Sequence, residues 1–154
     1  MPQVVLVQPQ IPPNTGNIAR TCAATQTELH LVGPLGFEVS DRHLKRAGLD
    51  YWPYVKLHMY DSIAEFEHMH QQRGGRWIGF STKGTENYTH IDYRENDWLL
   101  FGCETEGLPA NILDACSKTT YIPMSQANVR SLNLSVSVAI GLFEARRTLG
   151  HMNS

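Results

Sequence analysis

The first side chains that could carry chemistry lie in segment 11–20, where two prolines lead into a polar stretch with Asn14 and Arg20. A helix is predicted over 17–25, and a helix start offers backbone N–H groups to an anion. Arg20, about one turn inside this helix, is placed to contact a phosphate near that start. A structural salt bridge is the alternative role for a lone arginine.

Two further polar segments follow later in the chain. Segment 101–109 combines Gly102 and Gly107, which let the backbone approach a ligand closely, with Glu104 and Glu106. The two carboxylates are either an acid–base pair or an exposed turn. Segment 122–135 is a long polar stretch that leads into the last predicted helix, and Ser131 or Asn133 can cap that helix.

The elements that must position these segments follow an alternating pattern of short apolar runs and helix-length stretches. This pattern predicts one α/β domain, residues 1–154, with a mainly parallel sheet flanked by helices. In such sheets ligands bind beyond the carboxyl ends of the strands, and all three polar segments follow predicted strands. The predicted strands are 3–7, 28–32, 55–60, 77–81, 98–102 and 119–122, and the clearest helices are 17–25, 62–72 and 134–149.

Composition excludes several classes of protein. No apolar stretch approaches the roughly 18 residues of a membrane span, and the first residues read as a strand without a basic region, so we expect a cytoplasmic protein. Three cysteines without a CxxC pair indicate neither a disulfide framework nor a zinc ribbon. His68 and His70 are two apart on a predicted helix and do not share a face, so no metal site is expected.

Nucleotide and nucleic-acid binding are constrained as well. The chain has neither GxGxxG nor GxxxxGK[ST], which disfavours an ordinary dinucleotide fold, a P-loop enzyme and the glycine-first methyltransferase fold. The formal net charge of −2 means that any RNA surface must be local. Basic clusters at 42–46, 73–76 and 146–147 are candidates, although each cluster alone is more often a solvated face.

Taken together, the three polar segments resemble the signature motifs of the SPOUT superfamily of RNA methyltransferases, in the same order and approximate spacing. Asn14-Thr15-Gly16-Asn17-Ile18-Ala19-Arg20 resembles the first motif, segment 100–109 the second, and Ile122-Pro123-Met124 with 131–135 the third. The likeness covers nearly the whole chain. With Arg46-Ala47-Gly48-Leu49-Asp50-Tyr51 and Thr82-Lys83-Gly84, the chain looks closest to the TrmL (YibK) type, which methylates the ribose 2′-hydroxyl of the pyrimidine at tRNA wobble position 34.

The resemblance implies a fold, a cofactor and residue roles. The fold would be the α/β-knot fold, with a deep carboxy-terminal trefoil knot. S-adenosylmethionine would be bound by Phe80, Gly102, Gly107, Ile122, Ser131 and Leu132. The polar set around the reaction centre would be Asn14, Arg20, Glu104, Ser131 and Asn133. The tRNA phosphates would contact Lys45, Arg46, Arg146 and Arg147.

The expected reaction is an in-line displacement in which a ribose oxygen attacks the methyl carbon of a sulfonium, without a metal. Because an arginine side chain is a poor base, Arg20 is expected to clamp a phosphate and stabilise the developing charge. The proton would then pass to that phosphate, to Glu104 or to water. A ribose methyltransferase for another tRNA or rRNA site, and a non-catalytic knotted RNA-binding protein, are the alternative functions.

A homodimer with an active site completed across the interface is also expected. The last helix carries an apolar stripe of Val136, Ala139, Ile140 and Phe143, and the helix after Asn14 carries Ile18 and Cys22 at i, i+4 spacing. Such stripes are more often intramolecular core, and the resemblance is what favours an interface. On this reading Cys22 faces the partner subunit.

Overall fold

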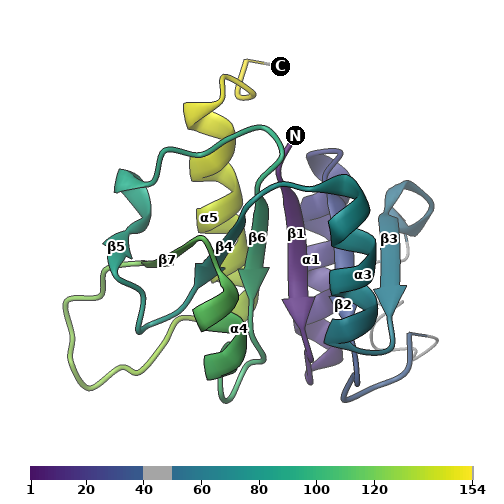
Figure 1. The fold of residues 1–154 in the computed structure, drawn as a ribbon, viewed down its shortest axis with the longest axis horizontal. Helices are drawn as coiled ribbons and strands as arrows, with labels where there is room; N and C mark the ends of the chain where they lie inside the picture. Colours follow the sequence, from purple (N-terminus) through teal and green to yellow (C-terminus); the bar gives the residue numbers. More distant parts are fainter. Residues whose placement is uncertain (40–49, 154) are drawn as a thin grey trace.

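A computed structural model describes residues 1–39 and 50–153. Its centre is a seven-stranded sheet in the order β3-β2-β1-β6-β4-β7-β5, and every strand pair is parallel (Figure 1). The predicted α/β class is therefore confirmed. The strands are β1 Gln3–Val7, β2 Glu28–Val32, β3 Lys56–Tyr60, β4 Trp77–Phe80, β5 Glu86–Asn87, β6 Trp98–Phe101 and β7 Lys118–Tyr121. The helices are α1 Pro12–Ala24, α3 Ile63–Arg73, α4 Ala110–Ala115 and α5 Leu134–Thr148, with short 3-10 turns at Trp52–Tyr54 and Tyr88–His90.

The sheet separates two apolar cores, because successive side chains of a strand point to opposite faces. In β1, Val4 and Leu6 belong to the core under α1 and α5, whereas Val5 and Val7 belong to the core under α3 and α4. All four side chains are buried, as expected for a central parallel strand covered on both faces. Figure 1 shows the same layers, with α3 and α4 in front of the sheet and α1 and α5 behind it.

Local capping signals set several helix ends. Ser62 accepts a hydrogen bond from the backbone N–H of Glu65 at 3.2 Å and so caps α3, as its spacing predicts. Asn133 caps α5 in the same way, accepting from the N–H of Ser135 at 2.8 Å. Gly150, with φ of 80°, follows the end of α5 in the left-handed conformation that glycine tolerates.

The start of α1 differs from the prediction. The helix begins at Pro12, five residues before the predicted start, and therefore already contains Asn14. Proline is compatible with the first helical positions because its missing N–H has no intrahelical partner there and its φ is already helical. The predicted helix start at residue 17 is therefore wrong.

Two short elements had no sequence prediction. Strand β5 has two residues, Glu86–Asn87, and pairs with β7, where the hydroxyl of Thr120 donates to the carbonyl of Glu86 at 2.8 Å. Helix α4 has six residues, which is too short for a periodic apolar pattern to appear. The predicted ends of β3, β4, β6 and β7 differ from the structure by one residue at most. The trefoil knot stays a prediction. No helix in the described residues is long and apolar enough to cross a membrane.

Candidate functional site

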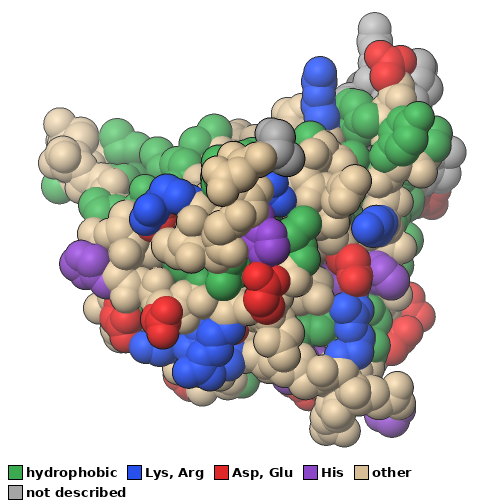
Figure 2. Space-filling model, turned by 90° about the horizontal axis from the view of Figure 1, so that it is seen from above, with side chains coloured by type: hydrophobic (Ala, Val, Ile, Leu, Met, Phe, Trp, Pro, Cys, Tyr) green, Lys and Arg blue, Asp and Glu red, His purple; other side chains and the backbone are tan. Residues whose placement is uncertain are grey.

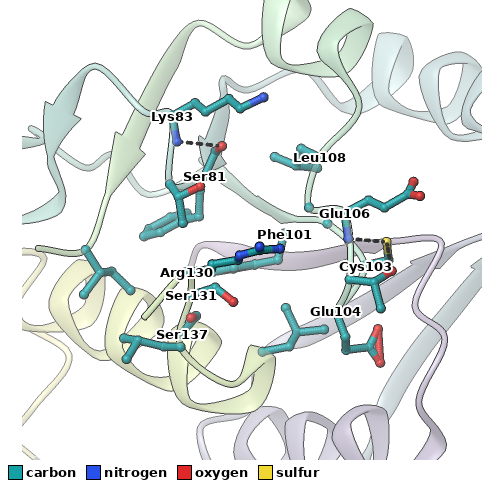
Figure 3. A pocket seen from close by; sticks show the side chains of 18 of the residues that line it. Ser81, Lys83, Phe101, Cys103, Glu104, Glu106, Leu108, Arg130, Ser131 and Ser137 are labelled. Atoms are coloured by element: carbon teal, nitrogen blue, oxygen red, sulfur yellow. Dashed lines mark hydrogen bonds between the residues drawn. The ribbon is translucent and has the colours of Figure 1, made fainter. Parts of the chain in front are cut away.

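A pocket of about 230 Å³ lies beyond the carboxyl ends of β4, β6 and β7 (Figure 3). These strands are neighbours in the sheet, so the segments that follow them meet at one edge. The walls come from the loop after β4, the loop after β6 and the segment between β7 and α5. All six residues expected to bind the cofactor line this pocket, namely Phe80, Gly102, Gly107, Ile122, Ser131 and Leu132. The fold thus brings together residues that are up to 52 positions apart, from 80 to 132.

The loop after β6 is folded back on itself, and this conformation requires glycine at positions 102 and 107. A Cβ on Gly102 would lie 1.9 Å from the carbonyl carbon of Gly107 and 2.1 Å from the backbone nitrogen of Leu108. Gly107 has a φ of +71°, and its N–H donates to the carbonyl of Cys103 at 3.0 Å. A Gly102→Val substitution would therefore displace the loop itself.

Glu104 ties this loop to the beginning of α1. Its two carboxylate oxygens accept hydrogen bonds from the backbone N–H groups of Gln10 at 2.9 Å and Ile11 at 2.6 Å. The hydroxyl of Thr105 adds a bond to the side-chain oxygen of Gln10 at 3.0 Å. The carboxylate therefore satisfies N–H groups at the start of α1, which have no partner within the helix. Both oxygens are engaged, which favours a positioning role over proton acceptance.

Asn14 and Asn133 join the two helices that flank the pocket. The side-chain amide of Asn133 donates to the side-chain oxygen of Asn14 at 3.1 Å, while its own oxygen caps α5. Asn14 is buried in the first turn of α1. The pair fixes the amino end of α5, and with it Ser131 and Leu132, relative to α1.

Of the expected polar set, Glu104 and Ser131 line the pocket, whereas Asn14, Asn133 and Arg20 do not. Arg20 also takes no part in the hydrogen bond that joins Asn14 to Asn133. It is not among the lining residues, and its guanidinium lies over the ring of Tyr51, 5.4 Å from the centroid. The Tyr51 hydroxyl donates to the carbonyl of Gly16 at 3.3 Å, and burial raises its pKa. Arg20 is exposed to solvent, so it is free to contact a molecule outside its own chain.

Comparison with known proteins decides the family. Residues 1–143 match the SpoU rRNA Methylase family. The chain belongs to this SpoU methylase family. A protein of Synechocystis sp. is 60% identical over 97% of both chains. The tRNA (cytidine(34)-2′-O)-methyltransferase of Yersinia pestis is 46% identical, covering 98% of this chain and 96% of its own.

A solved structure described as "Structural insights into the 2-OH methylation of C/U34 on tRNA" is similar in fold as well as in sequence. It is 49% identical, covers 97% of each chain and superposes with a TM-score of 0.93. The likeness spans the whole sheet and both helical layers. The SpoU methylase fold is therefore present along nearly the whole chain.

The cations expected to bind RNA differ in burial and in ion pairing in this SpoU methylase. Arg146 is buried, and its guanidinium donates to the carbonyls of Thr25 at 3.2 Å and His151 at 2.9 Å. The expectation of a phosphate contact there is corrected, since Arg146 fastens the end of α5 to the chain. Arg147 is exposed but pairs with Glu144 at 2.8 and 3.0 Å. Lys45 and Arg46 lie outside the described residues.

Two pocket cations were not among the predicted site residues. Lys83 and Arg130 both line the pocket, and both are exposed. A signal for each was present in the sequence, since Lys83 lies in the Thr82-Lys83-Gly84 segment and Arg130 directly precedes Ser131.

The two apolar stripes that were predicted to form a dimer interface differ in burial. Cys22 and Ile18 are 0% exposed and lie in the core between α1, α5 and the sheet, so the expectation that Cys22 faces a partner is wrong. Burial raises the pKa of the Cys22 thiol to about 12. On α5, Val136 and Phe143 remain 46% and 38% exposed, because the opposite side of the helix, including Val138 and Leu142, fills the core.

A separate cluster of titratable side chains lies on β2 and β3, at the other end of the sheet. Possible ligand atoms of Glu28, His30 and His58 lie within 4.8 Å of one another. However, Arg73 donates to both Glu28 oxygens, at 2.8 and 3.1 Å. The two imidazole rings stack with planes 11° apart, so their nitrogen lone pairs do not converge on one point.

This cluster therefore has a structural role, in which its charges are paired and its rings are packed against each other. Hydrogen bonding from Arg73 lowers the pKa of Glu28 to about 2, and burial lowers the pKa of His30 to about 4. His30 also shares a hydrogen bond with the hydroxyl of Tyr60 at 2.9 Å. A buried imidazole kept neutral in this way belongs to the core.

Proposed function

We propose that this chain transfers a methyl group from S-adenosylmethionine to the ribose 2′-hydroxyl of nucleotide 34 in tRNA. The observation that carries the proposal is the convergence of all six expected cofactor residues in one pocket at the carboxyl edge of the sheet. Ser131, which also belongs to the expected reaction set, lines the same pocket. The names of the relatives support the methyl acceptor, nucleotide 34 of tRNA.

The pocket lining suits this cofactor. Leu108, Ile122 and Leu132 provide apolar contacts for an adenine ring, and backbone groups of the glycine loop provide polar ones. The carboxylates of the same loop favour a cationic ligand such as a sulfonium. Bound S-adenosylmethionine supplies an electrophilic methyl carbon, so the protein has mainly to orient the ribose oxygen toward it.

The residue roles follow from the contacts. Asn14 and Asn133 hold α1 and α5 together beside the pocket, and Glu104 holds the cofactor loop against α1. Because both Glu104 oxygens accept backbone N–H groups, the ribose proton is assigned to the adjacent phosphate or to water. Arg20 stabilises the negative charge that develops on the ribose oxygen.

We assign Arg20 to the pocket of a second copy of the chain, because it does not line the pocket of its own chain and its side chain is exposed. The proposal therefore includes a homodimer that packs through the outward face of α5. Val136 and Phe143 give that face an exposed apolar character, which a second copy would cover.

The test combines methyl transfer with mapping of the product. The protein is incubated with radiolabelled S-adenosylmethionine and tRNA, and nuclease digests are analysed by mass spectrometry for a 2′-O-methyl group on nucleotide 34. Arg20→Ala should nearly abolish transfer while S-adenosylmethionine affinity in calorimetry stays close to wild type.

Three results would contradict parts of the proposal. Label at another nucleotide, or in rRNA fragments, would move the acceptor site. A protein that binds tRNA but transfers nothing would be a binding module. A fully active monomer in sedimentation at micromolar concentration would remove the shared site.

A further inference from the structure

Of the ten Lys and Arg side chains in the described residues, four are paired with a carboxylate and a fifth is buried. Arg73 pairs with Glu28, Arg76 with Asp97, Lys118 with Glu86 and Arg147 with Glu144, and Arg146 is buried. On the face that carries the amino ends of the strands, Lys and Arg side chains are interspersed with Asp and Glu (Figure 2). The described residues on that face form no continuous basic area for a polyanion.

The pocket holds two of the exposed and unpaired cations of the described residues. Lys83 and Arg130 have no ion pair with a carboxylate in the part of the chain that the structure describes, and both are exposed while lining the pocket. They come from two segments, the loop after β4 and the segment before α5. Figure 3 shows the Arg130 side chain extending into the middle of the pocket beside Phe101, with Glu104 and Glu106 on the far side.

The position of Arg130 relates it to a specific group of an RNA substrate. It directly precedes Ser131, which is expected beside the methyl acceptor. In RNA the 2′-hydroxyl of every internal ribose neighbours the 3′-phosphodiester on the adjacent carbon. A guanidinium can bind such a phosphate through two parallel hydrogen bonds, and an ammonium binds one as a point charge.

We propose that Arg130 and Lys83 form a clamp for the RNA backbone at the mouth of the pocket. Arg130 binds the phosphate on the 3′ side of the methylated ribose, and Lys83 binds a neighbouring phosphate. This inference rests on the proposed function, because it takes the pocket as the place where the ribose is methylated. It assigns to this pocket the phosphate contact that buried Arg146 cannot make.

The carboxylate of the cofactor is the other oxyanion that these cations could meet. A single carboxylate can neutralise one of the two cations, whereas successive phosphates of one strand can contact both. The geometry therefore favours the phosphates.

The experiment measures tRNA and cofactor binding separately. Arg130→Gln and Lys83→Gln remove one charge each, and tRNA affinity is measured by filter binding over a series of salt concentrations. We expect each variant to bind tRNA about tenfold more weakly, with the slope of log K against log salt reduced by about one. S-adenosylmethionine affinity in calorimetry should stay within about twofold of wild type, because the clamp contacts RNA phosphates and not the cofactor.

Matched controls come from the opposite edge of the sheet. Arg94→Gln and Lys56→Gln remove exposed cations that no carboxylate of the described residues pairs with and that lie away from the pocket. Both should keep wild-type tRNA affinity and salt slope. Arg130→Lys, which keeps the charge, should restore the slope but only part of the affinity, and circular dichroism confirms that each variant is folded.

Two outcomes would overturn the inference. Variants at 83 and 130 that bind tRNA like the two controls would show that no clamp exists. Loss of S-adenosylmethionine affinity with unchanged tRNA affinity would assign the cations to the cofactor carboxylate. Either result leaves methylation of nucleotide 34 by the wild type untouched, so failure of the clamp and failure of the proposed function are distinguishable.

Discussion

The hydrogen bonds from the start of α1 to Glu104 allow a quantitative prediction about the stability of the cofactor loop. Glu104→Ala removes two hydrogen bonds, from the backbone N–H groups of Gln10 and Ile11. A typical hydrogen bond contributes about 1 kcal/mol net, and the half-buried position of Glu104 argues against a larger value, so the variant should lose about 2 kcal/mol of folding stability. The loop should then spend less time in its closed conformation, and S-adenosylmethionine affinity should fall roughly 10- to 30-fold.

Urea denaturation and calorimetric titration measure the two effects. Glu106→Ala is the matched control for stability, because it removes the same charge from the same loop and its carboxylate has no hydrogen bond within the described residues. Its free energy of unfolding should stay within about 0.5 kcal/mol of wild type.

Methyl transfer at saturating cofactor separates positioning from proton transfer. If Glu104 only holds the loop, single-turnover transfer by Glu104→Ala should recover to within about tenfold of wild type once the cofactor site is filled. A general base would leave a loss of about 10²- to 10⁴-fold under the same conditions. Unchanged stability and cofactor affinity together with that persistent loss would refute the positioning argument.

Three further predictions concern the helices and the strand cluster. Asn133→Ala should lower the free energy of unfolding in urea by about 2 kcal/mol, half from the lost helix cap and half from the lost hydrogen bond to Asn14. Asn133→Ser can still cap the helix and should recover about half of that loss. An equal loss in both variants would contradict this division. The folded pKa of His30 is about 4, below its unfolded value, so the His30 contribution to stability should fall by up to about 3 kcal/mol as pH drops from 6.5 to 4. The loss that continues at lower pH belongs to Glu28, whose pKa is lowered to about 2. His30→Gln should lack the His30 component of the pH profile, and an identical profile would show that His30 is not the group responsible. Cys22→Asp should fail to fold, because it buries a carboxylate among apolar side chains; a folded monomer in sedimentation and circular dichroism would contradict the burial.

The sequence by itself determined the elements whose signals are local. Strands β1 and β2 lie at their predicted bounds, and Ser62 and Asn133 cap the helices that follow them. The pocket was predictable for a related reason. Each motif follows a predicted strand, and the carboxyl ends of parallel strands lie at one edge of the sheet. A ligand pocket was therefore expected at that edge.

Only the tertiary structure decided which side chains face the core, the solvent or each other. A helical spacing shows that a face is apolar but not what covers it, so Cys22 is fully buried in the chain while Val136 is exposed. Arg146 and Arg147 are adjacent in sequence, yet the turn of α5 buries one and leaves the other in solvent. The bond between Glu104 and Ile11 joins residues 93 positions apart, and Arg20 lies outside the pocket although Asn14, six residues earlier, lies beside Asn133. Such contacts depend on how strands and helices pack, and no local pattern of residues encodes them.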